Sequence, residues 1–252
     1  MTRRRFYAPP SAFADDGARI VLSPEESRHL RDVLRLRAGD EAHVFDGEGR
    51  EFACIVVETR GRVAALEVVG HVEPQGPESP LELTLAVALL KGEKFDLVVQ
   101  KATELGVARI APIAAARADV RPHDGREAAH RFERRQRLAL EAAKQSGRAR
   151  VPAVAAPSAF DAFVEDEARG GLRVLFSERG GVGLDSLSDE VGSSPKAVVA
   201  LVGPEGGWDD DEINLAREHG WKIVTLGGRT LRAETAAIAA CVLLQHLFGD
   251  LK

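Results

Sequence analysis

Leu201-Val202-Gly203-Pro204-Glu205-Gly206-Gly207 and Leu226-Gly227-Gly228-Arg229-Thr230-Leu231-Arg232-Ala233-Glu234 are the two stretches that decide the fold. Each begins where an apolar run ends and leads into a helical pattern, so each is predicted to form a turn between a strand and a helix. Glycine lets the backbone of such a turn adopt a positive φ or approach a ligand closely. In an open α/β sheet, ligands bind beyond the carboxyl ends of the strands, which is where both turns are expected. A pair of tight turns without a ligand is the alternative interpretation.

The sequence around these turns predicts an α/β domain over residues 81–252. Alternation of strands and helices is typical of a parallel sheet that is covered by helices on both faces. Strands are expected at 81–89, 107–113, 172–176, 197–202 and 221–226, and helices at 93–105, 127–146, 209–219 and 235–248.

The preceding residues predict a small β-rich domain over residues 1–72. Ser23-Pro24-Glu25-Glu26 is typical of a helix start, with serine as N-cap and proline at the first helical position. This helix is expected to run through Leu34 and to stop near Gly39. Strands at 41–45, 51–58 and 63–69, the first two joined by a turn at Asp46-Gly47-Glu48-Gly49, favour a small barrel. Residues 73–80, in a proline-rich stretch, are expected to be the linker.

Composition excludes several classes of protein. The 252-residue chain has 44% apolar and 29% charged residues, as soluble globular proteins do. No apolar run reaches the roughly 18 residues of a membrane span, and no apolar segment follows Arg3-Arg4-Arg5 as it does in a signal peptide. Cys54 and Cys241 are interpreted as buried structural thiols, which suit a reducing cytoplasm. No histidine pair has zinc-ligand spacing, so no metal is expected.

Positive charge is concentrated in two regions. The chain carries a net charge of −5, but residues 1–37 carry +3 and residues 117–150 carry +5. Because salt screens charges beyond about 8–10 Å, a locally basic surface can bind phosphate on a globally acidic protein. The two regions are interpreted either as RNA-binding surfaces or as solvated helix faces.

Familiar nucleotide-binding motifs are missing from the glycine-rich turns. The sequence has no phosphate-binding loop with its lysine, no dinucleotide fingerprint after the first strand and no serine in a nucleophile elbow. What remains is a pocket of backbone and apolar groups with Glu205, Arg232 and Glu234 nearby. Such a pocket suits an adenosine-bearing ligand that has no triphosphate.

These motifs resemble those of a known family. The two glycine-rich stretches, with Thr235 and Ala236 after them, resemble the C-terminal signature of the SPOUT methyltransferases, most of all the bacterial 16S ribosomal RNA uracil-N3 methyltransferase family. Residues 94–107 resemble that family's first helix, residues 141–152 its central motif, and residues 28–40 its PUA-like RNA-binding barrel. The similarity covers nearly the whole chain. Ala233 and Trp208 depart from it, since the family often has threonine and phenylalanine there.

The resemblance implies a fold, a cofactor and a substrate. The fold is α/β: a parallel-sheet SPOUT domain with a C-terminal trefoil knot, preceded by a small PUA-like β-barrel domain, in a homodimer whose active site lies at the subunit interface. The cofactor is S-adenosylmethionine, and the substrate is N3 of a uridine in ribosomal RNA or in the small ribosomal subunit. Cofactor-binding residues are expected to be Phe176, Ser177, Glu178, Leu201, Val202, Gly203, Pro204, Leu226, Gly227, Gly228, Leu231, Arg232 and Thr235.

Two charged residues are candidates for the chemistry. Arg232 is expected to stabilise the negative charge that develops on uracil, and Glu205 to act as a base or to orient one. A loop-stabilising hydrogen bond is the alternative for each. RNA-binding residues are expected to be Arg3, Arg4, Arg5, Arg28, Arg31, Arg35, Arg117, Arg121, Arg134 and Lys144.

Three other functions remain open at this point. A related SPOUT enzyme could methylate another base or a ribose 2′-oxygen with the same cofactor pocket. A non-catalytic RNA-binding protein would keep the barrel and the basic surfaces without needing both glycine-rich turns. A nucleotide-dependent enzyme that uses these turns for phosphate is disfavoured because the phosphate-loop lysine is missing.

Overall fold

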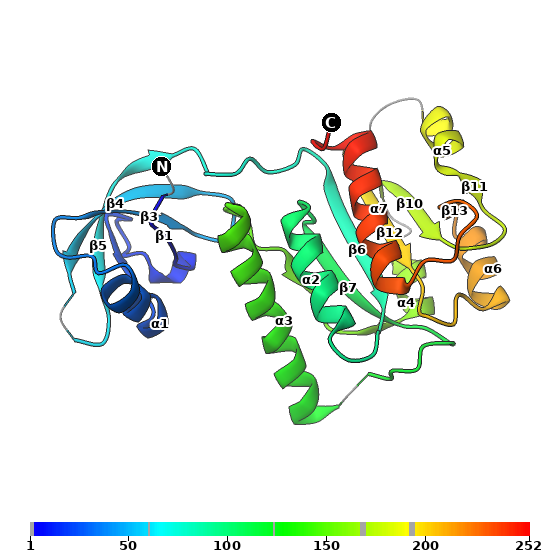
Figure 1. Cartoon of the computed structure of the whole chain (residues 1–252), viewed down its shortest axis with the longest axis horizontal. Helices are drawn as coiled ribbons and strands as arrows, with labels where there is room; N and C mark the ends of the chain where they lie inside the picture. Colours follow the sequence, from blue (N-terminus) through cyan, green and yellow to red (C-terminus); the bar gives the residue numbers. More distant parts are fainter. Residues whose placement is uncertain (1–2, 60, 123, 167–169, 192–194) are drawn as a thin grey trace. The chain divides into compact units, whose positions relative to one another are not determined.

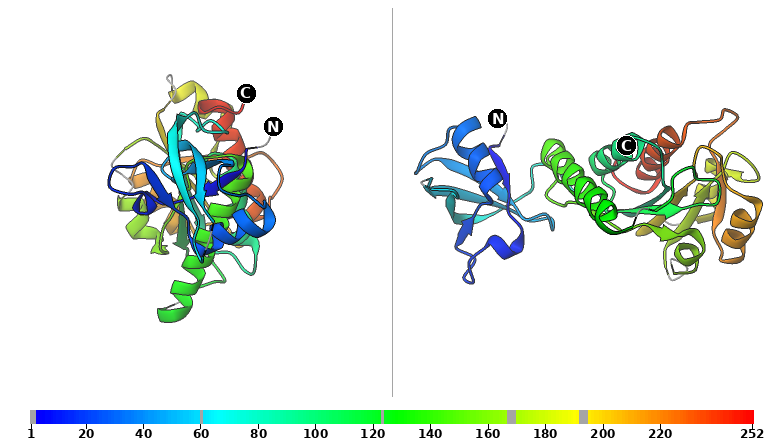
Figure 2. Two further views of the ribbon diagram at one scale, coloured as in Figure 1. Left: turned by 90° about the vertical axis from the view of Figure 1, so that its left-hand side faces the viewer. Right: turned by 90° about the horizontal axis from the view of Figure 1, so that it is seen from below.

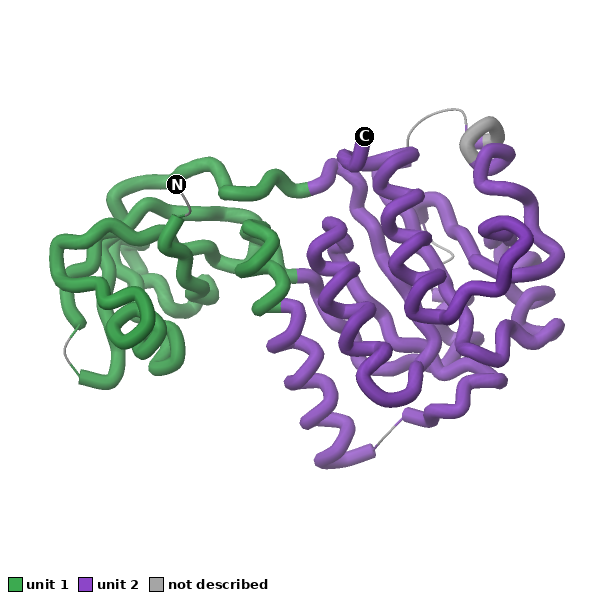
Figure 3. Tube along the Cα trace, in the orientation of Figure 1, with its two compact units in different colours: residues 1–78, 140–151 green, residues 79–139, 152–252 purple. Residues whose placement is uncertain are grey.

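The structure is a computed structural model that describes residues 3–59, 61–122, 124–166, 170–191 and 195–252, without the side chains of residues 188–190. Figure 3 shows that the chain forms two compact units. Unit 1 comprises residues 1–78 and 140–151, and unit 2 comprises residues 79–139 and 152–252. The sequence predicted one break near residues 73–80, whereas residues 140–151 return to unit 1. None of the described helices is both long and apolar enough to cross a membrane.

Unit 1 is built on a five-stranded mixed sheet. The first strand pairs with the third in parallel, and the other neighbours are antiparallel, which gives a half-barrel of PUA-like form. In the order of the sheet, the strands are β1 (Arg5–Tyr7), β3 (Glu41–Phe45), β4 (Glu51–Glu58), β5 (Ala65–Val72) and β2 (Arg19–Val21).

The helix predicted after Ser23 is shorter and less regular than expected. Helix α1 covers Pro24–Arg28, and the Ser23 hydroxyl accepts a hydrogen bond from the Glu26 backbone as predicted. The prediction of a regular helix through Leu34 is wrong, because a π-helical turn, η2 (His29–Val33), follows α1. Leu30 of this turn is buried, whereas Val33 and the following Leu34 are exposed, so the core does not hold the chain in α-helical register. A 3₁₀ turn, η1 (Pro10–Ala12), completes the unit's short helices.

Unit 2 is built on an eight-stranded sheet whose pairings are all parallel. Its central strands are almost fully buried apolar runs, as expected for a parallel sheet covered on both faces. In the order of the sheet, the strands are β11 (Val182–Gly183), β13 (Lys222–Thr225), β10 (Leu172–Phe176), β12 (Ala197–Val202), β6 (Glu82–Ala88), β7 (Arg109–Ala114) and β8 (Ala153–Val154), with β9 (Ser158–Ala159) also pairing with β7.

Helices cover both faces of this sheet (Figures 1 and 2). Helices α2 (Lys94–Glu104) and α7 (Ala233–Phe248) pack together, and α7 also contacts β12 and β6. Helices α4 (Phe160–Asp166) and α6 (Asp210–Glu218) lie together on the opposite face. The remaining helices are α3 (Gly125–Ser146) and α5 (Leu184–Val191).

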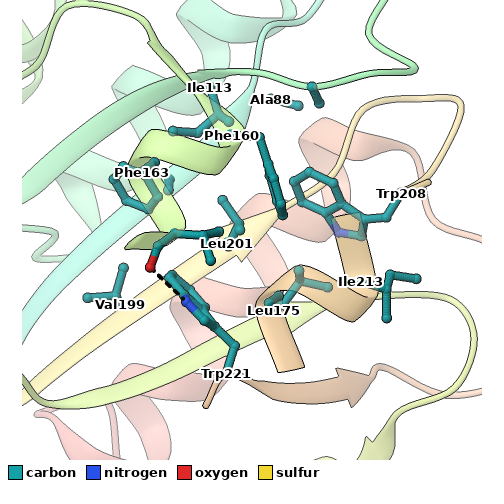
Figure 4. Close-up of a cluster of buried hydrophobic side chains, with 14 of the residues drawn as sticks. Ala88, Ile113, Phe160, Phe163, Leu175, Val199, Leu201, Trp208, Ile213 and Trp221 are labelled. Carbon is teal, nitrogen blue, oxygen red and sulfur yellow. Dashed lines mark hydrogen bonds between the residues drawn. The ribbon is translucent and has the colours of Figure 1, made fainter. Parts of the chain in front are cut away.

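The aromatic core of unit 2 lies on the α4 and α6 side of the sheet (Figure 4). Phe160 of α4 packs against Trp208, with ring centroids 5.1 Å apart, and Phe163 packs against Trp221 at 6.2 Å. The Trp221 indole donates a hydrogen bond to the Val164 carbonyl. These contacts fix the segments that follow β12 and α6.

Buried charge joins residues 140–151 to the rest of unit 1. The Arg5 guanidinium donates to the carboxylate of Glu51 at 3.0 Å and to the carbonyl oxygens of Lys144 and Arg148. Glu51 is fully buried and also accepts hydrogen bonds from Arg3 and from the Gln75 backbone. A buried guanidinium needs such partners, because moving an unpaired charge out of water is costly.

The Glu51 carboxylate provides a test of this arrangement. We expect Glu51→Ala to lower the free energy of unfolding by about 3–5 kcal/mol, because it leaves the buried Arg5 charge without its partner. Urea unfolding followed by circular dichroism measures the loss. Glu41→Ala, at an exposed position of the neighbouring strand, is the matched control and should change stability by less than about 0.5 kcal/mol. Equal effects of the two substitutions would show that the buried pair is not what stabilises unit 1.

Candidate functional site

A cavity lies beyond the carboxyl ends of three neighbouring strands of unit 2, β10, β12 and β13. Both glycine-rich stretches contribute to it, together with the end of β10 and the first turn of α7. Its volume is about 70 Å³. The residues that line it are Phe176, Ser177, Glu178, Val202, Gly203, Pro204, Gly207, Trp208, Leu226, Gly227, Arg229, Thr230, Leu231, Ala233 and Ala236.

The first glycine-rich stretch is folded around the Trp208 side chain. Trp208 is 1% exposed, and its indole nitrogen donates a hydrogen bond to the Phe176 carbonyl at 2.9 Å. A β-carbon at Gly203 would lie 3.0 Å from the indole ring, so a side chain there would displace it. Gly207 has a φ of +68° and donates to the Pro204 carbonyl, which closes the turn. The segment therefore requires glycine at Gly207 for its positive φ, as predicted, and at Gly203 because the Trp208 ring lies close to the backbone there.

Helix α6 is anchored directly after this turn. Asp209 caps the helix and forms a reciprocal capping box with Glu212. The Glu212 carboxylate also accepts a hydrogen bond from the Ala116 backbone at 2.8 Å, and Arg117 pairs with Asp209 at 2.9 Å. These bonds tie the turn to the segment that follows β7.

The second glycine-rich stretch is open to solvent. Residues 227–230 are exposed, and Gly227 has a φ of +93°. Arg232 occupies the N-cap position of α7 without capping the helix through its side chain. The Arg232 guanidinium is exposed, and no hydrogen bond or ion pair joins it to the rest of the described chain. It is therefore free to contact a ligand.

An ion pair connects the first glycine-rich stretch to α2. The Lys94 ammonium donates to the Glu205 carboxylate at 2.8 Å. Partial burial raises the pKa of Glu205, but hydrogen bonds from Lys94 and from its own backbone, together with the Lys94 charge, outweigh burial and lower that pKa. The hydrogen bond to Glu205 raises the pKa of Lys94 in turn. Both groups are therefore charged near neutral pH.

Two buried polar side-chain atoms of this part of unit 2 have no hydrogen-bond partner within the described residues. They are Oγ1 of Thr225, at the end of β13, and Oε2 of Glu234, in the first turn of α7. Thr225 precedes Leu226 and Glu234 follows Ala233 in the sequence, but neither Thr225 nor Glu234 is part of the cavity lining.

The cavity brings together most of the residues predicted to bind the cofactor. Leu201, Gly228, Arg232 and Thr235 are the four predicted residues outside its lining, and Leu201 is fully buried in the sheet core. Sequence reasoning did not select Gly207, Trp208, Arg229, Thr230, Ala233 and Ala236, although all six stand within or beside the quoted motifs. It also did not select Lys94, which only the folded chain brings to Glu205.

Two predicted RNA-binding residues have structural partners inside unit 1. Arg5 is buried by Glu51, and the Lys144 ammonium lies 2.7 Å from the Glu26 carboxylate, with both side chains largely buried. Burial lowers the pKa of Lys144, but the hydrogen bond and charge of Glu26 outweigh it and raise that pKa. Neither cation is therefore exposed for binding to RNA phosphates.

The other predicted RNA-binding residues are more accessible. In unit 1, Arg3 pairs with Glu51 and Arg31 donates to the Gly61 carbonyl. In unit 2, Arg117 pairs with Asp209, Arg134 with Asp96, and Arg121 donates to the Ala115 carbonyl. Three of the candidates are exposed and have no such partner within the described residues: Arg4, Arg28 and Arg35.

Comparison with known proteins places this geometry in a family. Residues 77–245 match the family model of an RNA methyltransferase domain, and residues 22–67 match that of an RNA methyltransferase PUA domain. The chain is 36% identical to ribosomal RNA small subunit methyltransferase E of Synechocystis, over 91% of this chain and 74% of the relative.

Solved structures agree with this match. The protein of that name from Neisseria gonorrhoeae, bound to S-adenosylmethionine, has a TM-score of 0.86 and 32% identity, with all of both chains covered. A Legionella pneumophila methyltransferase in complex with the same cofactor gives the same values. The chain therefore belongs to the RNA methyltransferase family that includes ribosomal RNA small subunit methyltransferase E.

Proposed function

We propose that this chain transfers a methyl group from S-adenosylmethionine to N3 of a uridine in small-subunit ribosomal RNA. The observation that carries the proposal is the cavity at the carboxyl ends of β10, β12 and β13, formed by both glycine-rich stretches in a chain of this family. Relatives named ribosomal RNA small subunit methyltransferase E, and the cofactor-bound structures that resemble the chain, support it.

The residues of the cavity fit the cofactor. Backbone groups and apolar side chains line most of it, which suits an adenosine moiety. The exposed Glu178 carboxylate, which lines the cavity, can accept hydrogen bonds from ribose hydroxyls. The cavity of about 70 Å³ is smaller than the roughly 300–1,000 Å³ typical of ligand sites, and residues 227–230 on its rim are exposed.

The cofactor and the residues around the cavity have different roles in the methyl-transfer step. When bound, S-adenosylmethionine supplies the electrophilic methyl group. Uracil N3 becomes nucleophilic as it loses its proton, and negative charge then spreads over the neighbouring carbonyl oxygens. The free guanidinium of Arg232, at the start of α7, is placed to stabilise that charge.

Glu205 serves better as an orienting group than as the base. Its lowered pKa makes the carboxylate a weak proton acceptor, and its hydrogen bond holds the Lys94 ammonium at 2.8 Å. Lys94 is close enough to Arg232 for the two charges to interact. Glu205 thus keeps a second cation near the candidate catalytic arginine.

The RNA surface that we propose is narrower than the sequence predicted. The exposed residues Arg4, Arg28 and Arg35 of unit 1 are its main candidates, because their charges are not taken up by neighbouring carboxylates. Arg5 and Lys144 are not part of this proposed surface, because both side chains are largely buried and paired with carboxylates.

We further propose a homodimer, as the resemblance implies. Helix α7 is apolar around most of its circumference, yet Val242 is exposed and Ile238 and Leu243 are half-buried. A helix that is apolar on all sides is normally buried, and a second copy would cover this one. The trefoil knot around the cofactor and a cytoplasmic location belong to the same proposal.

The direct test is methylation of ribosomal particles. We expect the protein with methyl-labelled S-adenosylmethionine to label small ribosomal subunits from a strain that lacks the modification, and mass mapping to identify 3-methyluridine. Label on another base or on a ribose oxygen would replace the proposed specificity with that of a related enzyme. Failure to bind the cofactor in calorimetry would favour a non-catalytic RNA-binding protein.

Substitutions of Arg232 distinguish a role in the methyl-transfer step from a role in cofactor binding. We expect Arg232→Ala to lower kcat about 10²- to 10³-fold, because a charge-stabilising donor acts mainly in the transition state. Single-turnover kinetics measures the loss, and calorimetry should show the cofactor Kd changed less than about threefold. Arg232→Lys keeps the charge but not the planar donor group and should retain part of the rate. An equal loss in rate and in cofactor affinity would instead make Arg232 a cofactor-binding residue.

The exposed arginines of unit 1 predict the salt dependence of RNA binding. We expect the Arg28→Ala/Arg35→Ala double variant to reduce the slope of log K against log salt by about 1.4, because each lost phosphate contact to single-stranded RNA contributes about 0.7. Fluorescence anisotropy with a labelled RNA measures it. Arg19→Ala is the control, since Glu58 already neutralises that charge, and its slope should equal that of the unchanged protein. A double variant with an unchanged slope would place the RNA elsewhere.

A further inference from the structure

A second and larger cavity lies in unit 2, outside the cavity described above. Its volume is about 300 Å³, within the range of small-molecule sites. It is enclosed by the segment after β6, the first turn of α2, part of the segment after β7 and the first half of α3. Leu89, Leu90, Phe95, Val120, Pro122 and Phe132 give it apolar walls.

A buried cation without a hydrogen-bonded partner lines this cavity. Arg135 of α3 is 8% exposed, and its guanidinium carbon lies 4.2 Å from the centre of the Phe95 ring. No hydrogen bond or ion pair joins this guanidinium to any other residue that the structure describes. Burial lowers the pKa of Arg135, and the nearby Asp96 charge offsets only part of that effect. Five N–H donors in such a place normally have acceptors.

The carboxylates of the cavity are already committed to other arginines. Asp96 accepts a hydrogen bond from Arg134 at 2.7 Å, and Glu127 pairs with Arg131 at 3.0 Å, one turn along α3. Glu93, the third carboxylate of the lining, also pairs with Arg134, at 3.8 Å, so none of the three forms a hydrogen bond or ion pair with Arg135. The N–H donors of the Arg135 guanidinium are therefore left available for an acceptor that a ligand brings.

The cavity is a neighbour of the proposed cofactor site along the edge of the sheet. Strands β6 and β12 are paired, with Val87 opposite Val202, so their carboxyl ends lie side by side. The residues after β6 line the larger cavity, and those after β12 line the smaller one. The Lys94–Glu205 ion pair joins the two, because Phe95 lines the larger cavity and Pro204 the smaller.

We propose that the larger cavity binds a second nucleotide of the RNA substrate, with its phosphate on Arg135 and its base against the apolar walls. A guanidinium binds phosphate through paired hydrogen bonds, and aromatic and apolar walls are what an unstacked base requires. The site rests on the proposed function in one respect only, that the ligand is the RNA being methylated. It would fix the strand beside the target uridine and so position that base.

The test replaces Arg135 by a residue of similar length without donors. We expect Arg135→Met to raise KM for small ribosomal subunits about 10- to 100-fold, the usual effect of losing hydrogen bonds to a charged group, while kcat and the cofactor Kd stay within about threefold. Its melting temperature should be unchanged or higher, because a buried charge without a partner is removed. Arg137→Met, at an exposed position on the same helix, is the matched control and should leave KM within about threefold.

A merely structural Arg135 gives the opposite pattern. Arg135→Met would then lower the melting temperature and leave KM unchanged, which overturns the proposal. If this variant does not fold, hydrogen exchange of the unchanged protein tests whether the larger cavity binds a nucleotide. Adding decauridylate should slow amide exchange over residues 127–135, and added uridine 5′-monophosphate at millimolar concentration should compete with it.

The same measurements separate this proposal from the proposed function. Protection of residues 127–135 by decauridylate without methylation of any ribosomal particle would overturn the methyltransferase proposal and support the nucleotide site. Methylation that proceeds with an unchanged KM in Arg135→Met, and without protection, would overturn the nucleotide site alone. Protection by monophosphate but not by decauridylate would assign the cavity to a free nucleotide and overturn its role in RNA binding.

Discussion

The candidate site depends on one hydrogen bond at the carboxyl ends of the parallel strands of unit 2. The Trp208 indole donates to the Phe176 carbonyl, and its ring fills the space between Gly203 and Phe160. The residues that follow β12 are thereby fixed against the end of β10, just beyond the point where Phe176 and Val202 pair in the sheet. Phenylalanine, common at this position in the family that the sequence resembles, could fill the space but could not donate this bond.

Local sequence patterns predicted the strands that carry buried apolar runs. Strands β3, β4, β10 and β12 have the predicted bounds, because each is an apolar or alternating run closed by turn residues. Strands β1 and β2 were missed because three residues give no readable period. Helix α4 was missed because its apolar residues, Phe160, Phe163 and Val164, are too few to show a helical repeat. Tertiary pairing decides such elements.

Charged residues were harder to place than apolar ones. A run of arginines looks the same in sequence whether its members face water or a buried carboxylate. Glu51 is 46 residues from Arg5 and Glu26 is 118 residues from Lys144, so no local pattern reveals either pair. The residues that line the cavity were predicted better than the charged residues. They lie in glycine-rich turns, and such turns can be recognised from a few neighbouring residues. Lys94, 111 residues from Glu205, again needed the fold.

The return of residues 140–151 to unit 1 constrains how the chain is assembled during synthesis. Domains usually fold as units in the order in which they leave the ribosome. Here the N-terminal half-barrel emerges long before the carbonyl oxygens of Lys144 and Arg148 that receive Arg5, and before the ammonium that neutralises Glu26. Its charged interior stays incomplete until α3 has been translated, so the first unit remains unfinished while residues 79–139 of unit 2 are made.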